Sequence, residues 1–259
     1  MFSLDELMGV LESVCPLSLS HKMIENGSYD NSGLLIEVNE KIEKILFSLD
    51  LSLDAVKKAI ELGCDTIITH HPAIYEPLKS LSITGETAPI VLAIKNQINV
   101  ISMHLNLDIA DSGIDQLLSV GLGGENIEIL SLVDGKNGYG RKAMVKETDL
   151  EQFVYNAKKT FMSDKIIAYG NKKVKEIASF CGSGASQAIA CLDTLKADTI
   201  ISSDIPHHHL KTLIESDKNV VIIPHYVSEQ YGFNSFYALL SEKIKGKAQT
   251  FYFLDKRFM

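Results

Sequence analysis

The sequence has little of what marks a nucleic-acid-binding, secreted or membrane-spanning protein. Its 259 residues carry a formal net charge of -8 and contain no run of Lys and Arg with interleaved aromatic residues, so we expect no nucleic-acid partner. The four cysteines show neither a CxxC spacing nor the pattern of a disulfide framework. No apolar run reaches the roughly 20 residues that a membrane-spanning helix needs, so we expect no membrane partner. The acidic first residues predict an amphipathic helix rather than a signal peptide, and together these features predict a soluble, cytoplasmic protein.

What the sequence does contain is an ordinary globular composition, with 46% hydrophobic and 22% charged residues. Short apolar runs alternate with helical patterns. The predicted strands are Lys44–Asp50, Asp65–His71, Ile98–His104, Glu176–Gly182, Asp198–Asp204 and Asn219–His225, and the predicted helices include Leu53–Leu62, Glu86–Asn96 and Ser186–Leu195. Continuous Ile and Val runs are typical of strands that are covered on both faces. The alternation predicts an α/β fold with largely parallel sheets covered by helices.

The chain shows signs of an internal duplication. The segment "CDTIIT" matches "ADTIIS", and Asp65 lies 133 residues before Asp198. A second match sets "INVISMHLNLD" over "NVVIIPHYVSE", with His104 lying 121 residues before His225. Buried strands resemble one another for general reasons, but polar residues that agree at strand ends favour a duplicated α/β half.

The duplication predicts the domain organisation. We expect a first α/β half over residues 1–124 and a second over residues 125–259, with the C-terminal segment as a candidate to pack back on the first half. The segment Val133–Gly140 is interpreted as a turn or a joint between the halves.

Histidines gather where the predicted strands end. Of the eight histidines, all but His21 stand at or just beyond such an end: His70, His71, His104, His207, His208, His209 and His225. In open α/β sheets, ligands bind beyond the carboxyl ends of the strands, so we expect chemistry at these ends.

Two His-x-x-x-carboxylate pairs point to a metal site. His104 with Asp108, and His225 with Glu229, are spaced so that both side chains share one face if the chain is helical there. Histidine and carboxylate together suit Zn, Fe(II) or Mn. One such pair alone fits a structural role, such as a cap or a surface hydrogen bond. Two pairs together with His70–His71 favour a centre of two divalent ions.

The same motifs resemble those of the NIF-three-like family, whose members are also known as GTP cyclohydrolase type 2 homologues. The match runs through "YDNSGL" (Tyr29–Leu34), "THHPAIYEPLK" (Thr69–Lys79), "HLNLDIADSGIDQLL" (His104–Leu118), "CGSGAS" (Cys181–Ser186) and "HYVSEQYG" (His225–Gly232). The resemblance implies two related α/β halves with a dinuclear metal centre between them, and a ring-shaped homohexamer. It places the metal ligands at His70, His71, Asp108, His225 and Glu229, with His104 nearby.

The chain departs from the usual family pattern at three places. Tyr29 stands where the family usually has Trp, Ser228 where it has Thr, and Ser202–Asp204 where it has "TGE". These changes leave the implied metal ligands intact and leave the choice of substrate open. The chain is also short for the family, which implies the form without an inserted domain.

Several other polar segments allow two interpretations. His207–His209 is a metal or substrate contact, or a polar loop that opens a helix. Gly182–Gly184 cradles a phosphate at a helix N-terminus or forms a plain turn. Lys79 pairs with a phosphate or is a surface lysine. Asp30 and Asn31 orient a ligating histidine or form a turn.

The residue types and the resemblance together predict a metal-dependent hydrolase that acts on a small molecule, with a nucleotide as the first candidate. Two ions, of Zn, Fe or Mn, would lower the pKa of a water and hold the oxygens of the reacting group. His104 or Asp204 would move protons. The family name implies opening of the purine ring of GTP. The alternatives are a metal-dependent phosphoesterase, and a metal-binding scaffold or regulatory protein without turnover.

Overall fold

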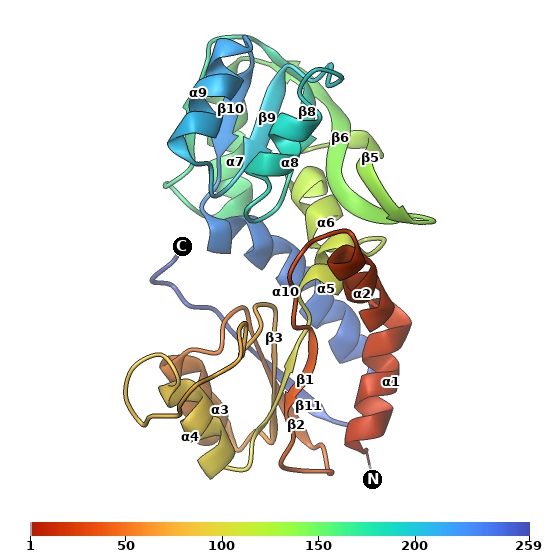
Figure 1. Cartoon of the computed structure of the whole chain (residues 1–259), viewed down its shortest axis with the longest axis vertical. Helices are drawn as coiled ribbons and strands as arrows, with labels where there is room; N and C mark the ends of the chain where they lie inside the picture. The colour runs from red at the N-terminus through yellow and green to blue at the C-terminus, as the bar shows by residue number, and fades with distance from the viewer. Residues whose placement is uncertain (1) are drawn as a thin grey trace. The chain divides into compact units, whose positions relative to one another are not determined.

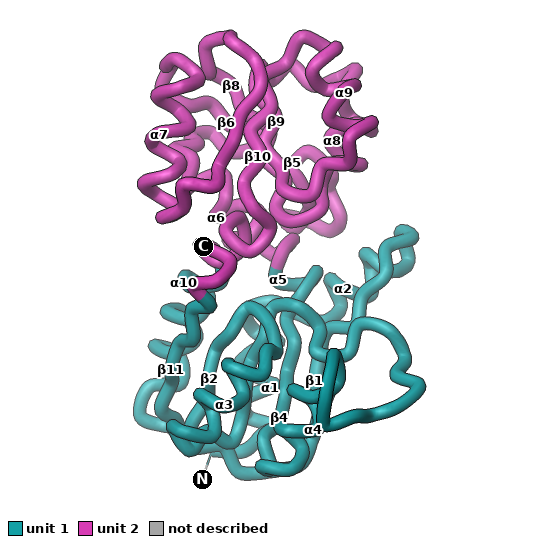
Figure 2. The backbone as a smooth tube through the Cα atoms, turned by 90° about the vertical axis from the view of Figure 1, so that its left-hand side faces the viewer, with its two compact units in different colours: residues 1–107, 233–255 teal, residues 108–232, 256–259 magenta. Residues whose placement is uncertain are grey.

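The computed structural model describes residues 2–259, which form two compact units (Figures 1 and 2). Unit 1 comprises the chain up to Leu107 together with Phe233–Asp255, and unit 2 comprises Asp108–Gly232 together with Lys256–Met259. These bounds differ from a division at residue 124. The segment that follows Leu107 belongs to unit 2 because its helix packs on the strands of that unit, and most of the C-terminal segment belongs to unit 1.

Unit 1 is built around a mixed sheet. Its elements are α1 (Leu4–Val14), α2 (Leu17–Glu25), β1 (Gly33–Ile36), β2 (Lys44–Ser48), α3 (Leu53–Leu62), β3 (Thr66–Thr69), α4 (Ala88–Lys95), β4 (Asn99–Ser102) and β11 (Gln249–Phe253). Within residues 2–259 this sheet has five strands in the order β1-β4-β3-β2-β11, of which β1 is antiparallel to β4 and the others run parallel. Two helices, α5 (Leu105–Ile109) and α10 (His225–Lys243), continue from one unit into the other.

The central strands β2, β3 and β4 of unit 1 are almost completely buried because both faces of the sheet are covered. Leu46 and Ile67 belong to a core with the helices α3 and α4, which lie together over one face (Figure 1). On β2, Phe47 instead meets Phe233 and Phe236 of α10, with ring centroids 6.3 and 6.1 Å apart. Burial on both sides therefore explains the continuous Ile and Val runs.

Unit 2 contains the second mixed sheet. Its elements are α6 (Ile114–Gly121), β5 (Glu125–Asp134), β6 (Asn137–Thr148), α7 (Leu150–Phe161), β7 (Ile167–Tyr169), β8 (Val174–Ser179), α8 (Ala185–Ala190), β9 (Thr199–Ser202), α9 (His207–Glu215) and β10 (Asn219–Ile222). Within the described residues the strand order is β5-β6-β8-β9-β10-β7, and β8, β9 and β10 run parallel. Helix α7 and the pair α8 and α9 lie on opposite sides of this sheet (Figure 2).

The two sheets repeat the same central design. In each, three parallel strands are joined by helices, and an antiparallel strand (β1 or β7) pairs with the last of them. Two polar residues repeat with their contacts. Asp65 accepts hydrogen bonds from two successive backbone N–H groups at the start of β2, and Asp198 does the same near the start of β8. Asn99 and Asn219, at the starts of β4 and β10, each bind the backbone of the segment beside them. These matched roles support the predicted duplication.

The register corrects the sequence matches by one residue at two strands. The offset of 133 residues that joins Asp65 to Asp198 would match Phe47 with Phe180. Ile68 pairs with Phe47, whereas the equivalent Ile201 pairs with Ser179, so Phe180 is not the counterpart of Phe47. Similarly, Asn99 and Asn219 are equivalent by register. His104 and His225 still correspond, because the chain has one extra residue between β10 and His225. Sequence similarity alone could not determine the register of these strands, because a shift by one residue still matches apolar residues with apolar residues.

Among the helices of residues 2–259, none combines the length with the apolar character that a membrane span requires.

Candidate metal centre

His70 and His71 follow β3 directly and turn away from strand geometry. The backbone N–H groups of both residues donate to the carbonyl oxygen of Leu49, at 3.1 and 3.0 Å. In a regular strand adjacent side chains point to opposite faces. Here the shared acceptor curls the chain, and the two rings lie with their centroids 4.9 Å apart. The irregular strand end before Pro72 thus brings both imidazoles to one place.

His104, just after β4, completes a histidine cluster of His70, His71 and His104. Its ring centroid is 5.2 Å from that of His70 and 5.9 Å from that of His71. One ring nitrogen of each histidine lies within 4.8 Å of the others, which is close enough for a shared ion.

The second nitrogen of each ring faces an oxygen atom. The Nδ1 of His70 is 2.8 Å from the carbonyl oxygen of Met103, a group that only accepts hydrogen bonds. The Nδ1 of His71 is 2.6 Å from Asp50, and that of His104 is 2.7 Å from Asp30. Each Nδ1 therefore carries the proton, and each Nε2 carries the lone pair that a metal ion needs. Oxygen partners of this kind commonly orient metal-binding histidines, so the cluster fits a divalent ion.

Asp30 is the more protected of the two carboxylates. Its side chain is fully buried, and besides His104 it accepts a hydrogen bond from Ser32 at 2.6 Å and another from Ser20. Burial alone would raise the pKa of Asp30, but the hydrogen bonds from His104 and Ser32 outweigh it and lower the pKa below its usual value. The carboxylate is therefore ionised and contacts His104. Of the two interpretations of Asp30, this contact favours the one in which it orients a histidine over a plain turn.

In unit 2, His225 and Glu229 form a pair on the first turn of α10. The Nδ1 of His225 is 2.6 Å from Asp204, and its Nε2 is 3.0 Å from the Oε1 of Glu229. Asp204 also accepts a hydrogen bond from the hydroxyl of Ser183 at 2.9 Å. The helical spacing predicted for this pair is confirmed, and Asp204 contacts the ring rather than standing apart from it.

The turn at Gly182 lies directly against this pair. Gly182 has φ = 57°, a left-handed conformation that glycine adopts without strain. A Cβ atom at this position would lie 2.5 Å from Glu229 Oε1 and 3.5 Å from His225 Nε2. The turn therefore leaves room for these two side chains, which supports the turn interpretation of Gly182–Gly184.

The carboxylate of Asp108 contacts the thiol of Cys181. Burial raises the pKa of the Cys181 thiol well above its usual value, and this thiol donates to Asp108 Oδ1 at 3.4 Å. The backbone of Cys181 is held in turn, because its N–H donates to Asp115 at 3.1 Å and its carbonyl accepts from Tyr139.

Behind Cys181 lies a fully buried ion pair. Arg141 Nη1 is 2.9 Å from Asp115 Oδ2, and neither side chain is exposed. Burial raises the pKa of Asp115 to about 7, although the guanidinium of Arg141 opposes this rise. Sequence patterns did not identify this pair, since the two residues come from α6 and β6 and meet only in the folded unit.

The remaining candidates have varied places. Asp50, which orients His71, was not predicted as a site residue, although it is the last residue of the predicted strand Lys44–Asp50. His207–His209 form the first turn of α9, with the rings of His208 and His209 4.2 Å apart. Within residues 2–259, no group of three or more close ligand atoms includes them.

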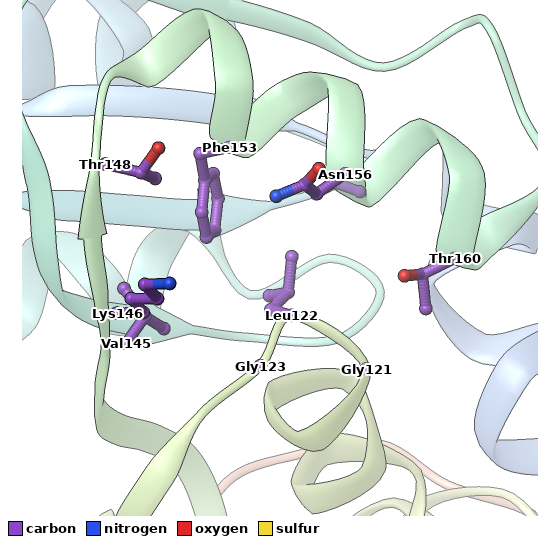
Figure 3. A pocket seen from close by; sticks show the side chains of 10 residues that line it. Gly121, Leu122, Gly123, Val145, Lys146, Thr148, Phe153, Asn156 and Thr160 are labelled. Carbon is purple, nitrogen blue, oxygen red and sulfur yellow. The ribbon is translucent and has the colours of Figure 1, made fainter.

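Unit 2 also contains a cavity of about 210 Å³, where the loop after α6 faces β6 and α7 (Figure 3). Its lining comprises Gly121, Leu122, Gly123, Val145, Lys146, Thr148, Phe153, Asn156, Ala157 and Thr160. None of these residues is a predicted metal ligand, so the cavity is separate from the histidines and carboxylates described above.

Known proteins resemble this chain along nearly its whole length. A family model described as Duf34/NIF3 (NGG1p interacting factor 3) matches residues 2–257. A GTP cyclohydrolase 1 type 2 homolog of Clostridium perfringens is 32% identical over 236 residues, which cover 87% of this chain and 86% of the relative. Another, from Methanocaldococcus jannaschii, is 31% identical over 249 residues, which cover 92% and 95%.

Solved structures agree with the fold. A Bacillus cereus protein related to NIF3 superimposes with a TM-score of 0.88 at 20% identity, covering 99% of this chain and 98% of that one. Reduced HcgD from Methanocaldococcus jannaschii gives a TM-score of 0.79 at 28% identity, with 97% of both chains covered. The predicted α/β fold and the predicted resemblance are both confirmed. Since the family model spans almost all of the sequence, and two relatives above 30% identity match over most of their length, the chain belongs to the Duf34/NIF3 (NGG1p interacting factor 3) family.

Proposed function

We propose that this protein is a metal-dependent hydrolase with two divalent ions, for which the ligands are His70, His71, Asp108, His225 and Glu229. The observation that carries the proposal is the histidine cluster, in which every Nδ1 is bound to an oxygen and every Nε2 carries a lone pair. The donor set of imidazole and carboxylate groups suits Zn, Fe(II) or Mn.

The surrounding residues would prepare these ligands. Asp50 and Asp204 fix the ring orientation of His71 and His225, each from 2.6 Å. Bound ions would polarise an oxygen of the substrate and lower the pKa of a water molecule. His104 is our candidate for proton transfer, because its contact with Asp30 fixes the tautomer and directs the lone pair of Nε2 away from that carboxylate. Asp204 remains a predicted proton carrier, although its contact with His225 favours an orienting role.

GTP is the first substrate to test. The support is the name of the relatives from Clostridium perfringens and Methanocaldococcus jannaschii, GTP cyclohydrolase 1 type 2 homolog. In the corresponding reaction, one water adds to C8 of the purine and the imidazole ring opens to a formamide, and a second water hydrolyses the formamide to formate and an amine. Phosphoesters are the second class, since ions of this kind also activate water for attack on phosphorus. The homohexamer and the cytoplasmic location stay predictions.

The test is turnover of the metal-loaded protein, measured as formate release and loss of the guanine absorbance. Wild type should turn over GTP, chelation should stop the reaction, and Zn, Mn or Fe(II) should restore it. Asp108→Ala should be inactive but folded. Asp193→Ala, at an exposed turn, removes the same charge and should remain active. Equal rates in wild type and Asp108→Ala would indicate a contaminant. No turnover of GTP or phosphoesters with two ions bound would favour a metal-binding scaffold.

A further inference from the structure

Two half-exposed tyrosines of unit 1 lie beside the histidine cluster. The ring centroid of Tyr75 is 6.3 Å from that of His104, with the planes at 85°. The ring of Tyr29 lies 4.9 Å from that of Tyr75, at 68°. Tyr29 is 50% exposed and Tyr75 is 46% exposed. Tyr75 therefore contacts both His104 and Tyr29, and both tyrosines present part of their surface to solvent.

The backbone holds both tyrosines in place. The hydroxyl of Tyr75 donates to the carbonyl oxygen of Tyr29 at 3.4 Å. The side-chain amide of Asn31 donates to the carbonyl oxygen of Ile74 at 2.5 Å. The N–H of Ala73 donates to the hydroxyl of Ser102, at the end of β4, at 3.1 Å. These bonds tie the segments on either side of the rings to each other and to the sheet, so the aromatic surface is preorganised.

The chain next to Tyr75 is also rich in exposed apolar side chains. The loop that follows Tyr75 exposes three aliphatic side chains: Leu78 at 42%, Leu81 at 55% and Ile83 at 72%. Exposed apolar side chains gathered on one loop commonly mark a binding surface. In an edge-to-face pair, one ring presents only its edge to its neighbour, so aromatic faces stay available for stacking.

We propose that Tyr29 and Tyr75 bind the planar heterocycle of the substrate by stacking and so place its ring atoms next to His104. The inference rests on the proposed function, because it takes the histidine cluster to be the reaction centre. It also narrows the substrate class. A purine or a similar fused ring gains from this surface, whereas a simple phosphoester has no ring to stack. Stacking of a base on an aromatic side chain typically contributes a five-fold to 150-fold increase in affinity, or about 1–3 kcal/mol.

The composition of the chain allows a direct binding assay. The sequence contains no tryptophan, so Tyr29→Trp introduces a single indole at the proposed surface. Its emission should be quenched saturably by guanosine and by GMP, and not by ribose 5-phosphate, which has no base. Tyr155→Trp, on α7 and 52% exposed at the wild-type tyrosine, is the matched control and should show only unsaturable collisional quenching.

Calorimetry on the original surface completes the test. Tyr29→Ala and Tyr75→Ala should each weaken GMP binding by about five-fold to 150-fold, whereas Tyr75→Phe, which keeps the ring and loses only the 3.4 Å hydrogen bond to Tyr29, should weaken it by less than about five-fold. Zinc stoichiometry should be unchanged in all three variants, which separates this inference from the proposed function. Absence of GMP binding to wild type, equal binding of ribose 5-phosphate, or unchanged affinity in the alanine variants would overturn it. A changed oligomeric state with unchanged GMP affinity would overturn it in favour of an interface between copies.

Discussion

Replacing Gly182 with alanine tests whether the turn beside Glu229 sets the position of that carboxylate. Gly135 is the matched control, since its φ of 55° is close to the 57° of Gly182 and nothing lies within 4 Å of its Cβ position. Both substitutions place a side chain in the left-handed region, at a cost of about 1–2 kcal/mol. Only in Gly182→Ala does the new methyl group meet Glu229 Oε1, at 2.5 Å.

The contact has to open to an ordinary distance of at least 3.4 Å, so the carboxylate oxygen moves by about 0.9 Å. This oxygen is the far end of a flexible side chain, and therefore the two variants should differ little in stability. A metal ligand tolerates deviations of only about 0.2 Å, so the ion affinity should fall. We expect a loss of about 10–100-fold, as for other residues that orient ligands.

A zinc titration against a competing chelator measures the affinity, and urea denaturation of the metal-free proteins measures the stability. Gly182→Ala should bind zinc more weakly than Gly135→Ala while unfolding at a similar urea concentration. If both variants bind zinc as wild type does, then Glu229 is not a ligand whose position depends on this turn.

Three further predictions concern the carboxylates. Asp50→Ala should weaken zinc binding more than Asp30→Ala, because Asp50 orients the proposed ligand His71 whereas Asp30 orients His104, the candidate for proton transfer; equal losses in the chelator titration would contradict this. At about pH 8, where the Asp115 carboxyl is ionised, Arg141→Met should lower the free energy of unfolding by about 3–5 kcal/mol, because it leaves Asp115 buried without its partner, and adding Asp115→Leu should recover most of the loss in urea denaturation. Burial raises the pKa of Asp115 to about 7, so between pH about 4 and about 7 this carboxyl is protonated in the folded protein and ionised in the unfolded chain. Its stabilising contribution is therefore complete below this window and is lost as the pH rises through it, and the stability of wild type relative to Asp115→Asn should fall across the window; a constant difference would refute the assignment.

The sequence predicted the central strands because they are buried on both faces. β2, β3, β4, β9 and β10 fall within the predicted apolar runs, β8 begins two residues before its predicted run of Glu176–Gly182, and the predicted bounds of Leu53–Leu62 coincide with α3. That helix also carries local signals, with Ser52 as its N-cap and the left-handed Gly63 as its C-cap.

The strands at or near the sheet edges escaped prediction for a physical reason. Most side chains of β5 are exposed or half-exposed, so it has no continuous apolar run. β11 pairs with β2 from the opposite end of the chain, a contact that no local pattern reveals. The segment Val133–Gly140 does contain a turn, which joins β5 and β6 into a hairpin within unit 2.

The sequence predicted the histidines and carboxylates of the candidate site. It predicted less well the residues that orient these side chains. The sequence predicted the cluster, because apolar runs indicate where strands end and the histidines stand at those ends. The partner of each ring depends on which side chains meet in three dimensions. Asp50 illustrates the difference: it follows β2 as His70 follows β3, but only the 2.6 Å contact with His71 reveals its role.

The most direct test of the account is the number of ions that the chain binds. Elemental analysis of protein reconstituted with zinc and freed of excess metal should give a stoichiometry near two per chain, and the double variant Asp108→Ala, Glu229→Ala should give a lower value. A stoichiometry near zero for wild type, or the same value for wild type and the double variant, would contradict the proposed centre.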